Sequence, residues 1–170
     1  MLDLYAPIEP GNSAAGFRIG QSLSSIEPFL QDVSHVDYTP DFHLSAALAA
    51  NEGALVLRNF GGHGGVTIFF GSDVVRLVFS AREQLGCIYV FEGYLGTYEG
   101  VRVGDMLAAL PTSEAFEFDD GDEMYYRHDS EGQYLPGFAV VAEVAETPER
   151  ASTQVTGYCV HNWNILRARA

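Results

Sequence analysis

The chain alternates between short apolar runs, rich in β-branched and aromatic residues, and polar stretches that contain glycine. The length and composition of the runs are typical of strands, and the clusters between them are typical of turns. The first half carries such runs at residues 54–60, 66–70, 74–79 and 87–91. The second half carries them near residues 124–128, 137–144 and 154–161. The pattern predicts antiparallel strands in both halves of the chain.

Three other segments have the pattern of short helices. Ser24 or Ser25 can cap a helix that runs to about Asp32, with Pro28 in the first turn, where its missing N–H costs little. A second helix is expected from Asp41 through residue 51, and a third over residues 105–110. Helices that precede strands predict an α+β fold.

One phrase occurs twice. Residues 16–23 read GFRIGQSL and residues 100–107 read GVRVGDML, 84 positions apart in a chain of 170 residues. In each copy the second glycine allows a sharp turn between a short strand and the start of a helix. The spacing predicts two similar αβ halves, residues 16–98 and 99–170, after a lead-in segment of residues 1–15, joined in one compact unit.

The charge is strongly negative. Nine Arg, no Lys and 23 acidic residues give a formal net charge of −14. Nucleic acids and anionic membranes bind through Lys and Arg, so both are excluded as partners. The absence of Lys also excludes the phosphate-binding lysine of P-loops and Schiff-base chemistry. No motif implies a cofactor.

The two cysteines, Cys87 and Cys159, lie in apolar strand-like runs. Free cysteines in such runs behave as small buried hydrophobes. The chain starts without a basic and apolar export segment and contains no stretch long enough to span a membrane, so a cytoplasmic location and reduced thiols are expected.

Acidic and tyrosine residues gather between residues 114 and 134. Exposed tyrosines beside carboxylates are typical of surfaces that bind basic proteins. We therefore predict a partner-binding site, and expect one of the adjacent tyrosines 125 and 126 to be exposed, because neighbours on a strand face opposite ways. Its candidate residues are Asp119, Asp120, Asp122, Glu123, Tyr125, Tyr126 and Tyr134.

A catalytic or small-ligand alternative stays open. His128, Asp129 and Glu131 could form an acid–base group, as in a small hydrolase, although no nucleophile or oxyanion site accompanies them. The glycine-rich stretch at residues 61–65 lies between two expected strands, so it is interpreted as a hairpin connection and not as a phosphate loop.

The repeated phrase, followed by the acidic aromatic run at residues 116–126, resembles segments of small bacterial immunity proteins, which neutralise contact-delivered toxins. The tandem plan also resembles the β-lactamase inhibitory protein and the assembly lipoprotein BamE. The absence of a signal peptide, a lipobox and paired disulfides sets this chain apart from those secreted or lipidated proteins. The resemblance implies a non-enzymatic inhibitor of a toxin, with a basic protein as partner.

Overall fold

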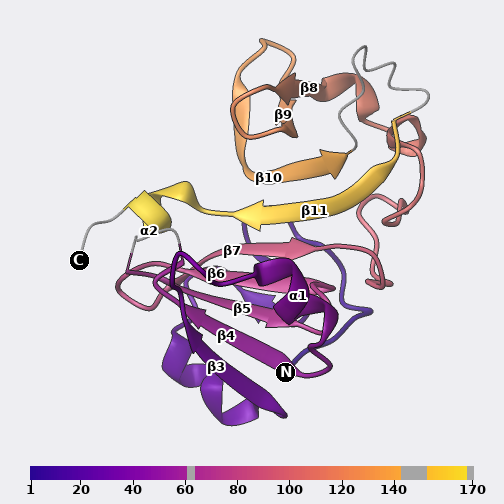
Figure 1. Cartoon of the computed structure of the whole chain (residues 1–170). Helices are drawn as coiled ribbons and strands as arrows, with labels where there is room; N and C mark the ends of the chain where they lie inside the picture. The colour runs from indigo at the N-terminus through magenta and orange to yellow at the C-terminus, as the bar shows by residue number, and fades with distance from the viewer. Residues whose placement is uncertain (61–63, 143–152, 168–170) are drawn as a thin grey trace.

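The computed structural model describes residues 1–60, 64–142 and 153–167. Its centre is a nine-stranded mixed sheet in the order β3-β4-β5-β6-β7-β11-β10-β9-β8 (Figure 1). A two-stranded pair of β1 (Ser13–Ala14) and β2 (Phe17–Arg18) lies outside it. The large sheet consists of β3 (Val33–Asp37), β4 (Ala54–Arg58), β5 (Val66–Phe70), β6 (Val75–Phe79), β7 (Leu85–Val90), β8 (Phe116–Asp119), β9 (Met124–His128), β10 (Tyr134–Ala142) and β11 (Val155–His161).

The predicted α+β architecture of helix-led halves is wrong. The fold is mostly β, and one continuous sheet runs through both halves of the chain. The segment expected to form a helix up to Asp32 forms two 3-10 turns, η1 (Leu23–Ser25) and η2 (Glu27–Phe29), and residues 105–110 form only η4 (Leu107–Ala109). In each segment the residue before the 3-10 turn is extended and pairs with another strand-like residue, Ser22 with Gln84 and Met106 with Gln154, so the α-helical conformation cannot begin there.

Two α-helices are present in the described residues. The helix expected to start at Asp41 is α1 (Leu44–Ala49), shorter than predicted. The other, α2 (Trp163–Arg167), follows β11 directly and was not predicted. A further 3-10 turn, η5 (Ser113–Ala115), leads into β8.

The two copies of the repeated phrase adopt the same turn. Gly16 and Gly100 have φ of 81° and 84°, and Gly20 and Gly104 have φ of 83° and 98°. These are left-handed conformations that glycine adopts at no steric cost. In each copy a 3-10 turn follows, η1 or η4, where the sequence predicted the start of an α-helix.

Each copy also docks on the first residue of a central strand. The N–H of Gly20 donates to the carbonyl of Leu85 in β7 at 2.7 Å, and the N–H of Gly104 donates to the carbonyl of Val155 in β11 at 2.8 Å. The strands β7 and β11 are antiparallel neighbours at the centre of the sheet. The two turns thus fix the starts of the strands through which the halves join.

The main core lies on one face of the sheet. It contains most of the buried side chains of β4 to β11 together with residues of the repeated turns, such as Leu23 and Leu107. The opposite face is covered only in part. There α1 packs on Leu55, Leu57 and Phe69, and α2 packs near Cys87 and Cys159.

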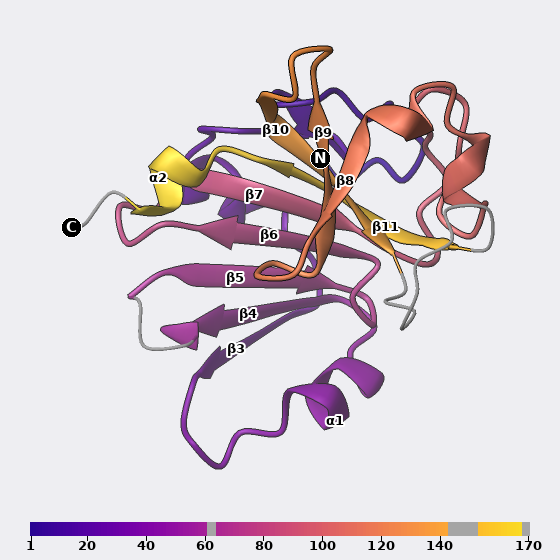
Figure 2. The same cartoon turned by 90° about the horizontal axis from the view of Figure 1, so that it is seen from above.

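The edge formed by β8 and β9 is set apart from the other edge of the sheet. β10 connects this hairpin to the central strand β11, and α2 leaves the end of β11 on the partly covered face (Figures 1 and 2). Side chains from α2 therefore face side chains from the hairpin across the end of the sheet.

Candidate functional site: an acidic aromatic groove

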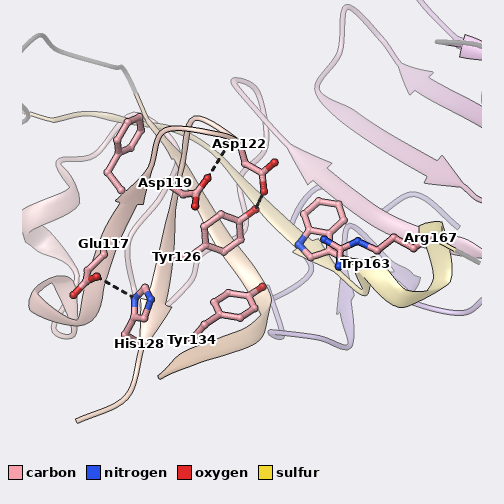
Figure 3. Close-up of a pocket in the computed structure, with 9 residues that line it drawn as sticks. Glu117, Asp119, Asp122, Tyr126, His128, Tyr134, Trp163 and Arg167 are labelled. Carbon is pink, nitrogen blue, oxygen red and sulfur yellow. Dashed lines mark hydrogen bonds and ion pairs between the residues drawn. The ribbon is translucent and has the colours of Figure 1, made fainter. Parts of the chain in front are cut away.

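A groove of about 330 Å³ lies between the β8–β9 hairpin and α2 (Figure 3). Aromatic and acidic side chains make up most of its lining. Tyr126 and Tyr134 come from the strand side, and Trp163 and Arg167 come from α2 (Figure 3). The lining residues are Glu117, Phe118, Asp119, Asp122, Tyr126, His128, Tyr134, Trp163 and Arg167.

Two carboxylates at the turn of the hairpin are held in fixed positions. Asp119 Oδ1 accepts the backbone N–H groups of Gly121 at 2.9 Å and Asp122 at 3.0 Å. Asp122 Oδ2 accepts the hydroxyl hydrogen of Tyr126 at 2.6 Å. Both residues are exposed, and the other oxygen of each carboxylate takes no part in these bonds.

The aromatic rings form a connected wall. Tyr126 makes edge contacts with Tyr134, at 5.2 Å between ring centroids, and with His161, at 5.9 Å. His161 stacks on Trp163 at 4.2 Å, and its Nε2 lies 3.3 Å from the hydroxyl oxygen of Tyr134. Each ring is therefore braced by at least one neighbour.

Burial sets the protonation states along this wall. It lowers the pKa of His161 to about 4, although the nearby Asp122 charge and the Phe138 carbonyl act in the opposite direction. Burial also raises the pKa of the Tyr126 hydroxyl, and the Asp122 carboxylate adds to this effect. Burial raises the pKa of Tyr134 as well. At neutral pH the rings of Tyr126, Tyr134 and His161 are therefore uncharged.

The predicted partner-binding residues divide into three groups. Asp119 and Asp122 line the groove together with Tyr126 and Tyr134. Asp120 and Glu123 are exposed on the same hairpin but do not line it. Tyr125 belongs to neither group, because its ring lies on the opposite face.

The expectation that Tyr125 or Tyr126 is exposed is wrong. Tyr125 is 2 % exposed and packs in the main core, with its ring centroid 5.1 Å from that of Phe118. Tyr126 does lie on the groove side but is only 6 % exposed, because Tyr134 covers it. The two tyrosines do point to opposite faces of β9, as expected for neighbours on a strand. Both faces are covered, however, so both rings are buried. Tyr134, at 41 %, is the exposed ring of the site.

The possible acid–base group is not assembled. His128 lines the groove with its Nδ1 3.9 Å from Glu117 Oε2. Asp129 instead closes the turn after β9, where its Oδ1 accepts the backbone N–H groups of Glu131 and Gln133. Glu131 is exposed in that turn and does not line the groove.

Glu117 and Phe118 line the groove but were not among the site residues predicted from the sequence, and neither were the residues that shape its α2 side. Trp163 and Arg167 are four residues apart, which places them on one side of α2. His161 stands two positions before Trp163, at the end of β11. The only sequence signal for this side of the groove was Trp163, an aromatic residue just beyond the last apolar run. Nothing in the sequence indicated that it would lie near a hairpin more than 30 residues earlier in the chain.

No family model matches this chain, and neither a curated protein nor a solved structure matches it. In the described residues, no helix is long and apolar enough to cross a membrane. Nor do three or more His, Cys, Asp or Glu side chains come together there in a way that could hold a metal ion. The groove therefore has to be interpreted from its own geometry.

Proposed function

We propose that the protein binds a basic protein partner through the β8–β9 hairpin and the adjoining groove, as an immunity-type inhibitor of a bacterial toxin. The observation that carries this proposal is the meeting of Asp119 and Asp122 with Tyr134 and Trp163 in one groove. Carboxylates attract a basic surface, and the rings supply large, rigid contact area.

The charge of the whole molecule supports the same interpretation. A net charge of −14 attracts a basic partner over a distance of about one Debye length, roughly 8 Å at physiological salt. The exposed Asp120 and Glu123 add to this attraction from the outer side of the hairpin. Attraction of this kind raises the association rate, whereas the aromatic contacts limit dissociation.

Covering a basic catalytic surface is sufficient for inhibition. The inhibitor then needs no catalytic group of its own, and the separation of His128 from Asp129 and Glu131 fits that role. We place the interaction in the cytoplasm, where an immunity protein would meet a toxin that has entered the cell.

Surface plasmon resonance tests the proposal with the product of the neighbouring gene as partner. Association should slow as salt is raised, because ions screen the attraction. Changing Asp119, Asp120, Asp122 and Glu123 together to their amides should slow association by at least about tenfold at low salt. Undiminished binding by that variant would place the interface elsewhere. Hydrolytic turnover without partner binding would favour an enzyme.

A further inference from the structure

We propose that the groove recognises a single arginine side chain of the partner. This inference rests on the proposed function and names the group that enters the site. The guanidinium would lie against the exposed faces of Tyr134 and Trp163, and its N–H groups would donate to Asp119 and Asp122. All four side chains line the same cavity (Figure 3).

The charges in the groove favour a cation. Three carboxylates line it, those of Glu117, Asp119 and Asp122, against one guanidinium, that of Arg167. Burial keeps His161 neutral at pH 7, because its pKa is lowered to about 4. The remaining negative charge lies beside aromatic rings, whose faces also attract cations.

The same face of the sheet already holds an arginine in this manner. The guanidinium carbon of Arg76 lies 5.3 Å from the ring centroids of Phe69 and Tyr89 and 5.0 Å from that of Phe91. Two nitrogens of Arg76 donate to the two carboxylate oxygens of Asp73. This internal site shows how rings and a carboxylate on this surface accommodate a guanidinium.

The geometry favours arginine over lysine. A guanidinium is planar, so it can stack on a ring while its edge donates to two acceptors. An ammonium is a compact, strongly hydrated charge without a flat face. Asp119 and Asp122 are acceptors on one side of the groove, and Trp163 presents a flat surface from the other (Figure 3).

Space is available for the side chain and its flanking backbone. The groove adjoins a second hollow of about 390 Å³, with which it shares Tyr134, Trp163 and Arg167. The second hollow continues past Pro136 and Asn162. An extended peptide can therefore place an arginine in the groove while its backbone continues into the hollow.

The chain contains a single tryptophan, Trp163, so its fluorescence reports on the groove and the hollow that adjoins it. The probes are the acetylated, amidated peptide Gly-Gly-Arg-Gly-Gly and its counterparts with Lys or citrulline at the centre. Citrulline has the shape of arginine without its charge. We expect a saturable change of emission with the arginine peptide, binding of the lysine peptide weakened by at least about fivefold, and no saturable change with citrulline.

Two matched double variants separate recognition from general attraction. Asp119→Asn with Asp122→Asn keeps the acceptors for the hairpin turn and for Tyr126, and should weaken arginine binding by about tenfold. Asp120→Asn with Glu123→Gln removes the same amount of charge from the same hairpin, but outside the groove. This variant should change the affinity for the arginine peptide by less than about twofold. Glu117→Gln provides a further groove variant if the first pair disturbs the turn.

Equal weakening by both double variants would overturn the inference, because the attraction would then be non-specific. Equal binding of the lysine and arginine peptides would also overturn it. If the basic partner binds with the expected salt dependence while no arginine peptide affects Trp163, the inference fails and the proposed function stands. Absence of partner binding would instead remove the proposed function.

Discussion

His161 stacks on Trp163 with 4.2 Å between the ring centroids and 19° between the ring planes. His161 is 1 % exposed and ends the strand from which α2 departs. Its ring therefore supports Trp163 from inside the sheet, and burial lowers the pKa of this imidazole to about 4.

The lowered pKa of His161 predicts a loss of stability in mild acid. The pKa of His161 is about 4 in the folded protein against an ordinary value of 6.5, so the unfolded chain takes up a proton first as the pH falls. The contribution of neutral His161 to the free energy of unfolding is fully present above pH 6.5. It is lost as the pH falls toward 4, by at most about 1.4 kcal/mol per pH unit. Urea unfolding between pH 7 and 4 should show a smaller slope for His161→Phe than for the wild type. Equal slopes would show that His161 does not titrate in this way.

Tyr134 should be the principal aromatic anchor for a partner. It is exposed, whereas Tyr126 beneath it is buried. Tyr134→Ala should weaken partner binding by about 2 kcal/mol, mainly through faster dissociation, and Tyr134→Phe should retain most of the affinity. Tyr5→Ala is the matched control, because Tyr5 is exposed but does not line the groove. Dissociation rates measured by surface plasmon resonance test this prediction. A similar loss of affinity in Tyr134→Ala and Tyr5→Ala would contradict it.

Arg167 should oppose an incoming cation. It lines the groove and carries the same charge as the proposed arginine. Arg167→Gln should therefore tighten binding of the arginine peptide by about two- to threefold at low salt, and the difference should shrink as salt is raised. Arg82→Gln serves as the control, because it removes an arginine that does not line the groove. Weaker binding by Arg167→Gln would show instead that Arg167 assists the ligand.

The two cysteines should be unreactive in the native protein. Cys87 and Cys159 are free and fully buried, with their sulfur atoms 3.2 Å apart, and burial raises the pKa of the Cys159 thiol. Only a thiolate reacts readily with a disulfide reagent. Titration should find no accessible thiol in native protein and two in denaturant. Absence of thiols in denaturant, with a mass lower by two hydrogens, would reveal a bridge.

Substitution of the turn glycines should cost similar amounts in the two copies. A Cβ at Gly20 or Gly104 would meet no atom within 4 Å, so the penalty comes from the positive φ alone. Gly20→Ala and Gly104→Ala should each lower the free energy of unfolding by about 1 kcal/mol, and the corresponding Asn variants by less. Thermal or urea unfolding of each variant and of the wild type measures the difference in the free energy of unfolding. A large loss at only one glycine would show that the two turns are not energetically equivalent.

Several features of this protein followed from the sequence alone. The strands predicted at residues 66–70 and 124–128 have those bounds in the structure, and the turn expected at Gly20 is present. These features depend on local properties: strand propensity, alternation and the freedom of glycine at positive φ. Local signals of this kind are contained in a few consecutive residues.

The assembly of the sheet and the groove depended on the tertiary structure. The pairing of β7 with β11 joins segments about 70 residues apart, and the parallel strand β3 has no marked sequence pattern. Tyr125 and Tyr126 have the same local signal, yet one belongs to the core and the other to the groove wall. Trp163 meets the acidic hairpin only because β10 and β11 bring α2 and the hairpin together. Strand pairing and side-chain burial are set by contacts between distant segments, so no window of sequence specifies them.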